Sequence, residues 1–260
     1  MKKIRRYLTN KEYWNKRWSE FKEDSKFFKN GNIYPIKYSD ITLLTYQAFF
    51  NKSKSKPKIL ECGCGLGRVL KHYHYQNYHI KGFDNNELAV KKVRKFDRKL
   101  NCVKSDIIKL PYKANFFDIA FAFGVFHNLE DEFVEAINEV MRCVKHNGVV
   151  CFSFASENIA TRIRESGHKG KQFYKWHFTE KDIQKLMLFC GIKPIMIETV
   201  QNIPMLYKYK WFRNSKNERQ NRTKGYKLNR QGEIINNFLL KLFPKQFGDT
   251  IIVIGQKIRS

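Results

Sequence analysis

Short apolar runs alternate along the middle of the chain with stretches in which apolar residues recur every three or four positions. The apolar runs, typical of buried strands, cover residues 58–62, 78–83, 101–104, 117–123, 149–154, 193–200 and 250–255. The helical spacing covers residues 67–75, 86–96, 131–147 and 179–191. Because the two kinds of element alternate, the pattern predicts an α/β fold built on a mostly parallel, doubly wound sheet.

Two regions outside this alternation precede or interrupt it. Near the N-terminus, Thr9 and Glu12 are spaced as a helix-capping box ahead of Trp14 and Trp18. We expect a helix there that docks on the domain, and the alternative is a lid whose aromatic side chains cover a substrate pocket. The second region, 157–178, is polar and contains glycine, which predicts a loop near the open edge of the sheet.

A third region, residues 201–249, separates the last two predicted strands and is expected to lie at the rim of the sheet. Its apolar run at 238–243 could pack on the sheet. The predicted division of the chain is an N-terminal helical cap (1–56), a core (57–200), a basic and aromatic insertion (201–249) and a final strand that completes the core (250–260).

Positive charge is concentrated at the two ends of the chain. The 260 residues include 50 Lys and Arg against 24 Asp and Glu, a net charge of +26. Residues 1–58 carry 15 basic and 5 acidic side chains, 59–155 carry 14 and 11, and 156–260 carry 21 and 8. Basic flanks favour an anionic partner: RNA, an anionic membrane surface, or an acidic or phosphorylated substrate. The simpler interpretation is a lysine-rich, solvated surface.

The distribution of apolar residues and cysteines bears on the cellular setting. No run approaches the roughly 18 apolar residues of a membrane-spanning helix, and the basic start is not followed by an apolar signal segment. A soluble cytoplasmic protein is therefore the expectation. The six cysteines lack paired spacing and are interpreted as reduced thiols of the core. His72 and His74 do not share a helix face, so no metal site is expected.

A glycine-rich loop follows the first predicted core strand. Gly63, Gly65 and Gly67 stand at every second position just before a helix, where backbone N–H groups can face a nucleotide-like ligand. The dinucleotide fingerprint requires a glycine where Arg68 stands, and the Lys-Ser/Thr end of a phosphate-binding loop is absent. Binding of NAD, FAD or ATP is therefore disfavoured.

Residues 61–67, Glu-Cys-Gly-Cys-Gly-Leu-Gly, resemble the first motif of the class I S-adenosylmethionine-dependent methyltransferases, and the similarity to the small-molecule, type 11-like branch extends over about residues 57–200 plus the last strand. The resemblance implies a Rossmann-like sheet of seven strands whose last strand is antiparallel. It also implies S-adenosyl-L-methionine as the cofactor.

The resemblance assigns cofactor contacts to the loops that follow successive strands. In the family the glycine loop contacts the methionine part, an acidic residue after the second strand accepts the ribose hydroxyls, and the segment after the third strand contacts adenine. The implied cofactor-binding residues are Glu61, Gly63, Cys64, Gly65, Gly67, Asp84, Asn85, Asp106, Ile107 and Phe123. Because Glu61, Asp84 and Asp106 are 23 and 22 residues apart, one β-α unit each, we expect all three carboxylates at the same sheet edge.

The acceptor is less constrained, because methyl transfer needs mainly alignment and exclusion of water. The motifs of adenine-amino and cytosine-carbon methylation are absent. The segment Phe123-Gly124-Val125-Phe126 suggests an apolar wall. The adjacent His127 is the candidate general base for a hydroxyl acceptor, or else a structural histidine. The predicted acceptor-side residues are Trp14, Trp18, Phe126, His127, Lys208, Lys210 and Arg213.

The sequence thus predicts a methyltransferase that acts on a small-molecule, glycan or lipid-precursor acceptor, with oxygen as the favoured atom. Two alternatives stay open. The basic flanks also suit an RNA methyltransferase, and a pseudoenzyme could bind the cofactor only to regulate a partner.

Overall fold

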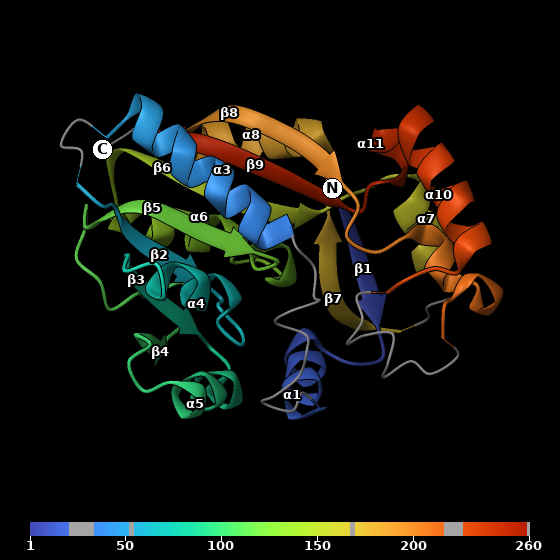
Figure 1. The fold of residues 1–260 in the computed structure, drawn as a ribbon, viewed down its shortest axis with the longest axis horizontal. Helices are drawn as coiled ribbons and strands as arrows, with labels where there is room; N and C mark the ends of the chain where they lie inside the picture. Colours follow the sequence, from blue (N-terminus) through green and yellow to red (C-terminus); the bar gives the residue numbers. More distant parts are fainter. Residues whose placement is uncertain (21–33, 52–54, 167–169, 216–225, 259–260) are drawn as a thin grey trace.

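The computed structural model describes residues 1–20, 34–51, 55–166, 170–215 and 226–258. A central sheet of seven strands has the order β4-β3-β2-β5-β6-β9-β8 (Figure 1). Its strands are β2 (Lys58–Cys62), β3 (His79–Asp84), β4 (Cys102–Lys104), β5 (Phe117–Phe123), β6 (Val144–Ala155), β8 (Ile192–Val200) and β9 (Thr250–Lys257). Strand β9 runs antiparallel to β6 and β8, and the other pairs are parallel, which confirms the predicted fold class.

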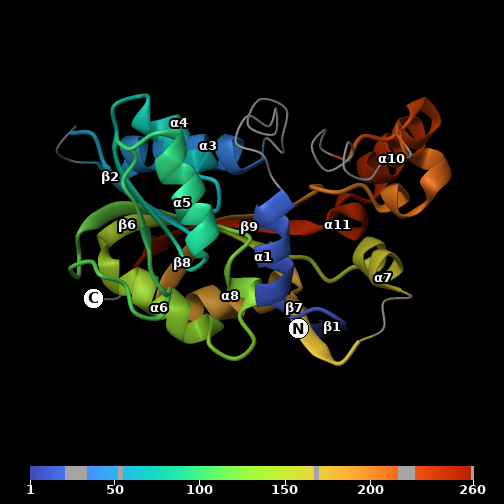
Figure 2. The ribbon, with the colours of Figure 1, turned by 90° about the horizontal axis from the view of Figure 1, so that it is seen from below.

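Helices cover both faces of this sheet (Figure 2). One layer contains α3 (Tyr34–Phe49), α4 (Arg68–His74) and α5 (Glu87–Phe96), and the other contains α6 (Phe133–Cys143) and α8 (Glu180–Phe189). Alternate side chains of a strand serve the two layers, so that Ile59 lies in the first apolar cluster and Leu60 in the second. Both side chains are fully buried.

The end of α6 differs from the expectation. The helix ends at Cys143, and residues 144–148 begin β6 instead of continuing the helix to Asn147. Val144 pairs with Phe117 of β5, and Lys145 reaches Asp118 at 2.8 Å. These contacts with the neighbouring strand outweigh the helical spacing of the apolar residues.

The N-terminal segment is not purely helical as expected. It begins with β1 (Lys2–Arg6), which pairs antiparallel with β7 (Gln172–His177) in a separate two-stranded sheet. Region 157–178, expected to be a loop, contains β7 and α7 (Ile159–Glu165). Helix α1 (Asn10–Glu20) follows β1. Helix α3 packs on the central sheet, where the Tyr46 hydroxyl donates a hydrogen bond to Asp118 at 3.0 Å.

The described residues of 201–249, which are 201–215 and 226–249, form a small helical unit at one end of the molecule (Figures 1 and 2). Its described elements are the single turns η2 (Met205–Lys208) and η3 (Lys210–Phe212) and the helices α10 (Arg230–Leu242) and α11 (Pro244–Phe247). It has a core of its own, centred on Met205, Leu206 and Leu228. The apolar run at 238–243 does not pack on the sheet, because α10 lies beyond the sheet edge and 60% of Phe238 is exposed. In the described ranges of the chain, no helix combines the length and apolar character needed to cross a bilayer.

Candidate functional site

A cavity of about 830 Å³ opens at the carboxyl ends of β2, β3, β5 and β6. Strand β2 lies between β3 and β5, so the chain crosses from one side of the sheet to the other at this point. In open α/β sheets such a switch point is where ligands bind. The volume falls within the usual range of about 300–1,000 Å³ for small-molecule sites. Helix α1, β7 and the start of the 201–249 unit complete its walls.

The glycine loop lines one end of the cavity in a conformation that other residues rarely adopt. Gly63 and Gly65 have φ values of +62° and +53°. A Cβ at Gly63 would lie 2.7 Å from Val125, and one at Gly65 would lie 2.9 Å from the Trp18 ring. Gly67, with a φ of +71°, does not line the cavity and instead precedes the first turn of α4. Two of the three glycines therefore shape the cavity directly.

Two buried carboxylates lie beside this loop. Glu61 accepts a hydrogen bond from the Leu70 backbone N–H at 2.7 Å, and burial raises its pKa to about 8. Asp84 accepts backbone N–H bonds from Gly65 and Asn86, both at 2.8 Å. Burial raises the pKa of Asp84, and these two bonds oppose the rise. Asp84 thus fixes the glycine loop, and its carboxylate oxygens can each accept a further hydrogen bond.

The third carboxylate is not in the cavity, contrary to the sequence expectation. Strand β4 ends at Lys104, and a turn carries Asp106 outward, where its side chain is exposed and accepts the Ile108 N–H at 3.3 Å. Its neighbours Ser105 and Ile107 do line the cavity. Of the other predicted cofactor contacts, those in the cavity lining are Cys64, Asn85 and Phe123.

Helix α1 places its aromatic side chains over the glycine loop. Trp14 and Trp18 both line the cavity and stack with ring centroids 5.3 Å apart. The helix is held at its start by Asn10, whose amide donates to the Tyr174 carbonyl oxygen at 2.8 Å, and at its end by Lys92, which donates to the Trp18 carbonyl oxygen at 2.6 Å. The structure therefore brings both tryptophans to the predicted site.

The two residues predicted after β5 have different surroundings. His127 lines the cavity, and so do Phe123, Gly124 and Val125 of the predicted apolar wall. Phe126 does not, because it is fully buried against Phe152 and Phe154. Burial and nearby Lys175 lower the pKa of His127 to about 3, so the imidazole is neutral near pH 7. Its Nδ1 is buried and has no hydrogen-bond partner among the described residues.

The three basic residues predicted to meet the acceptor, Lys208, Lys210 and Arg213, are not part of the cavity lining. Lys208 donates to the carbonyl oxygens of Ile163 and Ser166 at 2.6 and 2.9 Å, where it satisfies the end of α7. Arg213 lies over the Tyr207 ring and donates to that residue's carbonyl oxygen at 2.8 Å. Both side chains stabilise the 201–249 unit.

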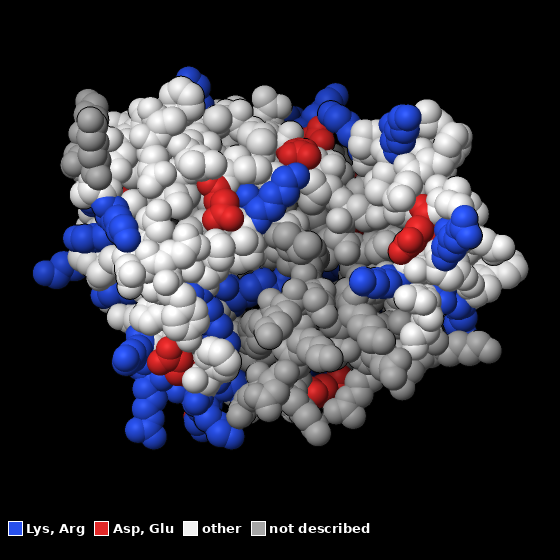
Figure 3. Space-filling model, in the orientation of Figure 1, with Lys and Arg blue, Asp and Glu red and all other residues white. Residues whose placement is uncertain are grey.

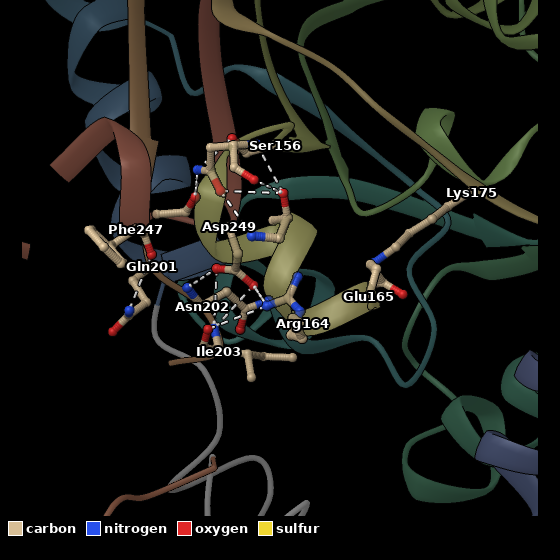
Figure 4. A network of polar contacts seen from close by, with 12 residues as sticks. Ser156, Arg164, Glu165, Lys175, Gln201, Asn202, Ile203, Phe247 and Asp249 are labelled. Atoms are coloured by element: carbon tan, nitrogen blue, oxygen red, sulfur yellow. Dashed lines mark hydrogen bonds and ion pairs between the residues drawn. The ribbon is translucent and has the colours of Figure 1, made fainter. Parts of the chain in front are cut away.

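A charged cluster that the sequence did not reveal contributes to another part of the cavity wall (Figure 4). Arg164 and Lys175 line it, each paired with a buried carboxylate: Arg164 with Asp249 at 2.8 Å and Lys175 with Glu165 at 3.5 Å. Asp249 also accepts N–H bonds from the start of the 201–249 unit. The aromatic residues Phe173, Tyr174 and Trp176, which favour strands, could have indicated strand β7.

Lys175 is the cation of this cluster that is best placed for a ligand. Its side chain is only 15% exposed, and burial lowers its pKa to about 8. The 3.5 Å distance to Glu165 exceeds that of an ordinary charged hydrogen bond, so its protons can serve an anion in the cavity. Glu165 also forms an ion pair with Arg6 at 2.8 Å. Burial alone would raise the pKa of Glu165, but the nearby charges of Lys175 and Arg6 lower it to about 2.

The residues at the glycine-loop end fit the cofactor that the sequence resemblance implies. The positive φ values leave room for the backbone to meet a ligand where a Cβ would stand. Asp84 and Asn85 offer polar side chains for hydroxyl groups, and Ile107 and Phe123 offer apolar contact surface. The remaining part of the cavity, toward Lys175, is left for an acceptor.

Comparisons with known proteins agree with this geometry. Residues 60–152 match a family model described as a methyltransferase domain. An uncharacterized protein of Methanocaldococcus jannaschii is 23% identical over 174 residues, which are 66% of this chain and 69% of that protein. The cycloartenol-C-24-methyltransferase of Arabidopsis thaliana is 32% identical over 72 residues, which are 25% of this chain and only 21% of the plant protein.

Solved structures share the fold over most of their length. A SAM-dependent methyltransferase from Archaeoglobus fulgidus has a TM-score of 0.54 at 17% identity, with 86% of this chain and 98% of that chain covered. The cyclase SpnF has a TM-score of 0.58 at 14% identity, with 99% and 100% covered.

Proposed function

We propose that this chain, which contains a class I S-adenosylmethionine-dependent methyltransferase domain, methylates an oxygen atom of a small, negatively charged acceptor, the amphiphilic glycan and lipid precursors included. The family and its structural neighbours imply S-adenosylmethionine as the cofactor. The observation that carries the proposal is Lys175, a buried cation in the cavity wall.

The cofactor supplies an electrophilic methyl group on sulfur, and the chain's own residues hold and align the two reactants. Asp84 and the glycine loop orient the cofactor, while Trp14 and Trp18 exclude water from the reacting end. Lys175 pairs with the negative group of the acceptor. Phe123, Val125 and Leu129 provide the apolar part of the wall. Alignment of this kind can supply much of the rate enhancement for methyl transfer.

A labelling experiment tests the proposed class of acceptor. Extract incubated with the enzyme and with cofactor labelled in its methyl group should yield labelled products of low molecular weight. These products should bind an anion exchanger, because the anionic group that Lys175 holds is not the oxygen that receives the methyl group. Labelled product that is polymeric and sensitive to ribonuclease would instead establish the RNA alternative. RNA binding would also weaken steeply as salt rises.

The alternative of a pseudoenzyme, which would bind the cofactor only to regulate a partner, gives a different result in the same experiment. It predicts cofactor binding without label transfer to any fraction of the extract. A single labelled product eliminates it.

The position of His127 leads to a prediction that differs from the sequence-based one. A group with a pKa of about 3 is a poor base toward a hydroxyl, but its unpaired Nδ1 can accept a hydrogen bond from the acceptor or orient it. His127→Ala should therefore lower kcat by no more than about tenfold and leave cofactor affinity unchanged. The pH profile of kcat should keep its shape. A loss of about a hundredfold or more, with loss of the acidic limb of that profile, would restore His127 as the general base.

A further inference from the structure

Helix α10 exposes a continuous apolar stripe at the outer end of the molecule. Ile234, Phe238 and Leu242 follow one another at intervals of four residues and are 62%, 60% and 52% exposed. Ile235, three positions before Phe238 and therefore beside it on the helix surface, is also exposed. Figures 1 and 2 both place α10 farthest from the central sheet. We call these four residues the α10 stripe. They expose large apolar side chains on the solvent face of the helix, where polar residues are usual.

The inner face of α10 fixes the orientation of this stripe. Asn236 is buried and exchanges two amide hydrogen bonds with Gln201, at 2.8 and 3.0 Å. Gly232 is buried where a Cβ would lie 3.1 Å from the Phe212 carbonyl oxygen, and Leu239 packs on the small core of the 201–249 unit. Because this face is committed to the protein, the helix cannot rotate to bury its stripe.

Basic side chains border the stripe. Arg230 and Lys241 are both exposed and stand eleven positions apart, about three helical turns, so they share one edge of α10 beside Ile234. The helix carries a single acid, Glu233. Over residues 201–249 the sequence has 11 Lys and Arg against 3 Asp and Glu. Figure 3 shows white, uncharged surface over much of α10 and α11, with Lys and Arg around it and acidic atoms beside it.

We propose that α10 docks this protein on an anionic phospholipid surface. A helix whose outer face carries Phe and aliphatic residues, with cations along its edge, is suited to lie in the interface between headgroups and acyl chains. The apolar side chains would enter the acyl boundary, and Arg230 and Lys241 would lie at the level of the phosphates. Cations near an anionic bilayer add electrostatic attraction to the burial of the apolar side chains.

The same features argue against other occupants of the stripe. Two-fold pairing of two α10 helices would bring the Arg230 and Lys241 side chains of both copies onto one interface, where like charges repel. RNA would be held by the cations at the border, and the aliphatic residues Ile234 and Leu242 offer bases no stacking surface. A lipid surface satisfies both the apolar centre and the basic border.

Vesicle co-sedimentation of the full chain tests the proposal without cofactor or turnover, so its outcome is independent of the proposed function. Wild-type protein should sediment with vesicles of phosphatidylcholine mixed with phosphatidylglycerol and far less with phosphatidylcholine alone. Phe238→Ser should lower the partition coefficient about fivefold, because one large apolar side chain no longer leaves water. Replacing Arg230 and Lys241 together by Gln should reduce the preference for the anionic vesicles more than the same replacement of two exposed lysines elsewhere, because only the first pair borders the stripe.

The matched control is Phe189→Ser on α8, because Phe189 is 71% exposed but has a different position in the fold. It should bind vesicles as the wild type does. Thermal melting should be the same for both serine variants, since each replaced side chain is exposed. The proposal fails if Phe238→Ser and Phe189→Ser bind the vesicles equally. It also fails if the wild type forms a stable dimer that does not bind vesicles, or if the protein binds RNA in place of vesicles and both serine variants lose RNA binding equally.

Discussion

Asp84→Ala is expected to weaken S-adenosylmethionine binding by about 10- to 150-fold, because hydrogen bonds to a charged group contribute about 1.5–3 kcal/mol. The carboxylate lies at the glycine-loop end of the cavity, and its Oδ2 also accepts the Gly65 N–H at 2.8 Å. The substitution therefore removes a ligand contact and releases the loop that shapes the site. Titration calorimetry with the cofactor and with its demethylated product measures the change.

Asp106→Ala is the control for this experiment. Both aspartates follow neighbouring strands, but Asp106 is exposed and caps a turn outside the cavity. Its removal should leave cofactor affinity within about twofold of wild type, since a surface contact contributes little. Equal losses in the two variants would mean that the third carboxylate does reach the cofactor, as the strand spacing alone suggests. An unchanged affinity in Asp84→Ala would overturn the assignment of the ribose-binding group.

The difference between these two aspartates shows what a sequence can and cannot predict about such a site. Apolar runs, and the distance of one β-α unit between successive carboxylates, are local properties of the sequence. They located the strands of the central sheet and the glycine loop. Whether Asp106 points inward depends on β4 ending at Lys104 and on the turn that follows it. No local pattern in the sequence distinguishes that turn from one with the opposite side-chain direction.

The acceptor side was harder to predict for a different reason. Lys175 reaches the cavity because β7 pairs with β1, more than 160 residues away in the chain. Arg164 is placed by its ion pair with Asp249, which directly precedes β9. Such long-range pairing is decided by tertiary packing, so the density of basic residues in 201–249 does not indicate which cation lines the cavity.

Lys175→Met is expected to raise the KM of an anionic acceptor about 10- to 100-fold, with kcat little changed, because the ammonium contributes to binding and takes no part in breaking a bond. The variant should still fold, because Glu165 keeps its 2.8 Å ion pair with Arg6. Steady-state kinetics at saturating cofactor separates the two constants. Lys185→Met, on the exposed face of α8, is the matched control and should behave as wild type.

The pH dependence gives an independent test of the same residue. An anion is bound by the protonated ammonium, and burial lowers the pKa of Lys175 to about 8. The kcat/KM for the acceptor should therefore be level below this value and fall as the pH rises through it, about tenfold per pH unit. Around Lys175, Glu165 has a pKa of about 2, and His127 and His177 have pKa values of about 3 and 2, so these neighbours do not change charge near pH 8.

Lys175→Arg tests whether deprotonation of the Lys175 ammonium causes that fall. A guanidinium stays protonated throughout this range, so the variant should keep a level profile where the wild type declines. Glu61, whose pKa is raised to about 8 by burial, titrates in the same range but lies on the cofactor side, and saturating cofactor removes its effect on the acceptor constant. If the arginine variant declines in parallel with wild type, the titrating group is not Lys175, and the negative charge of the acceptor loses its main support.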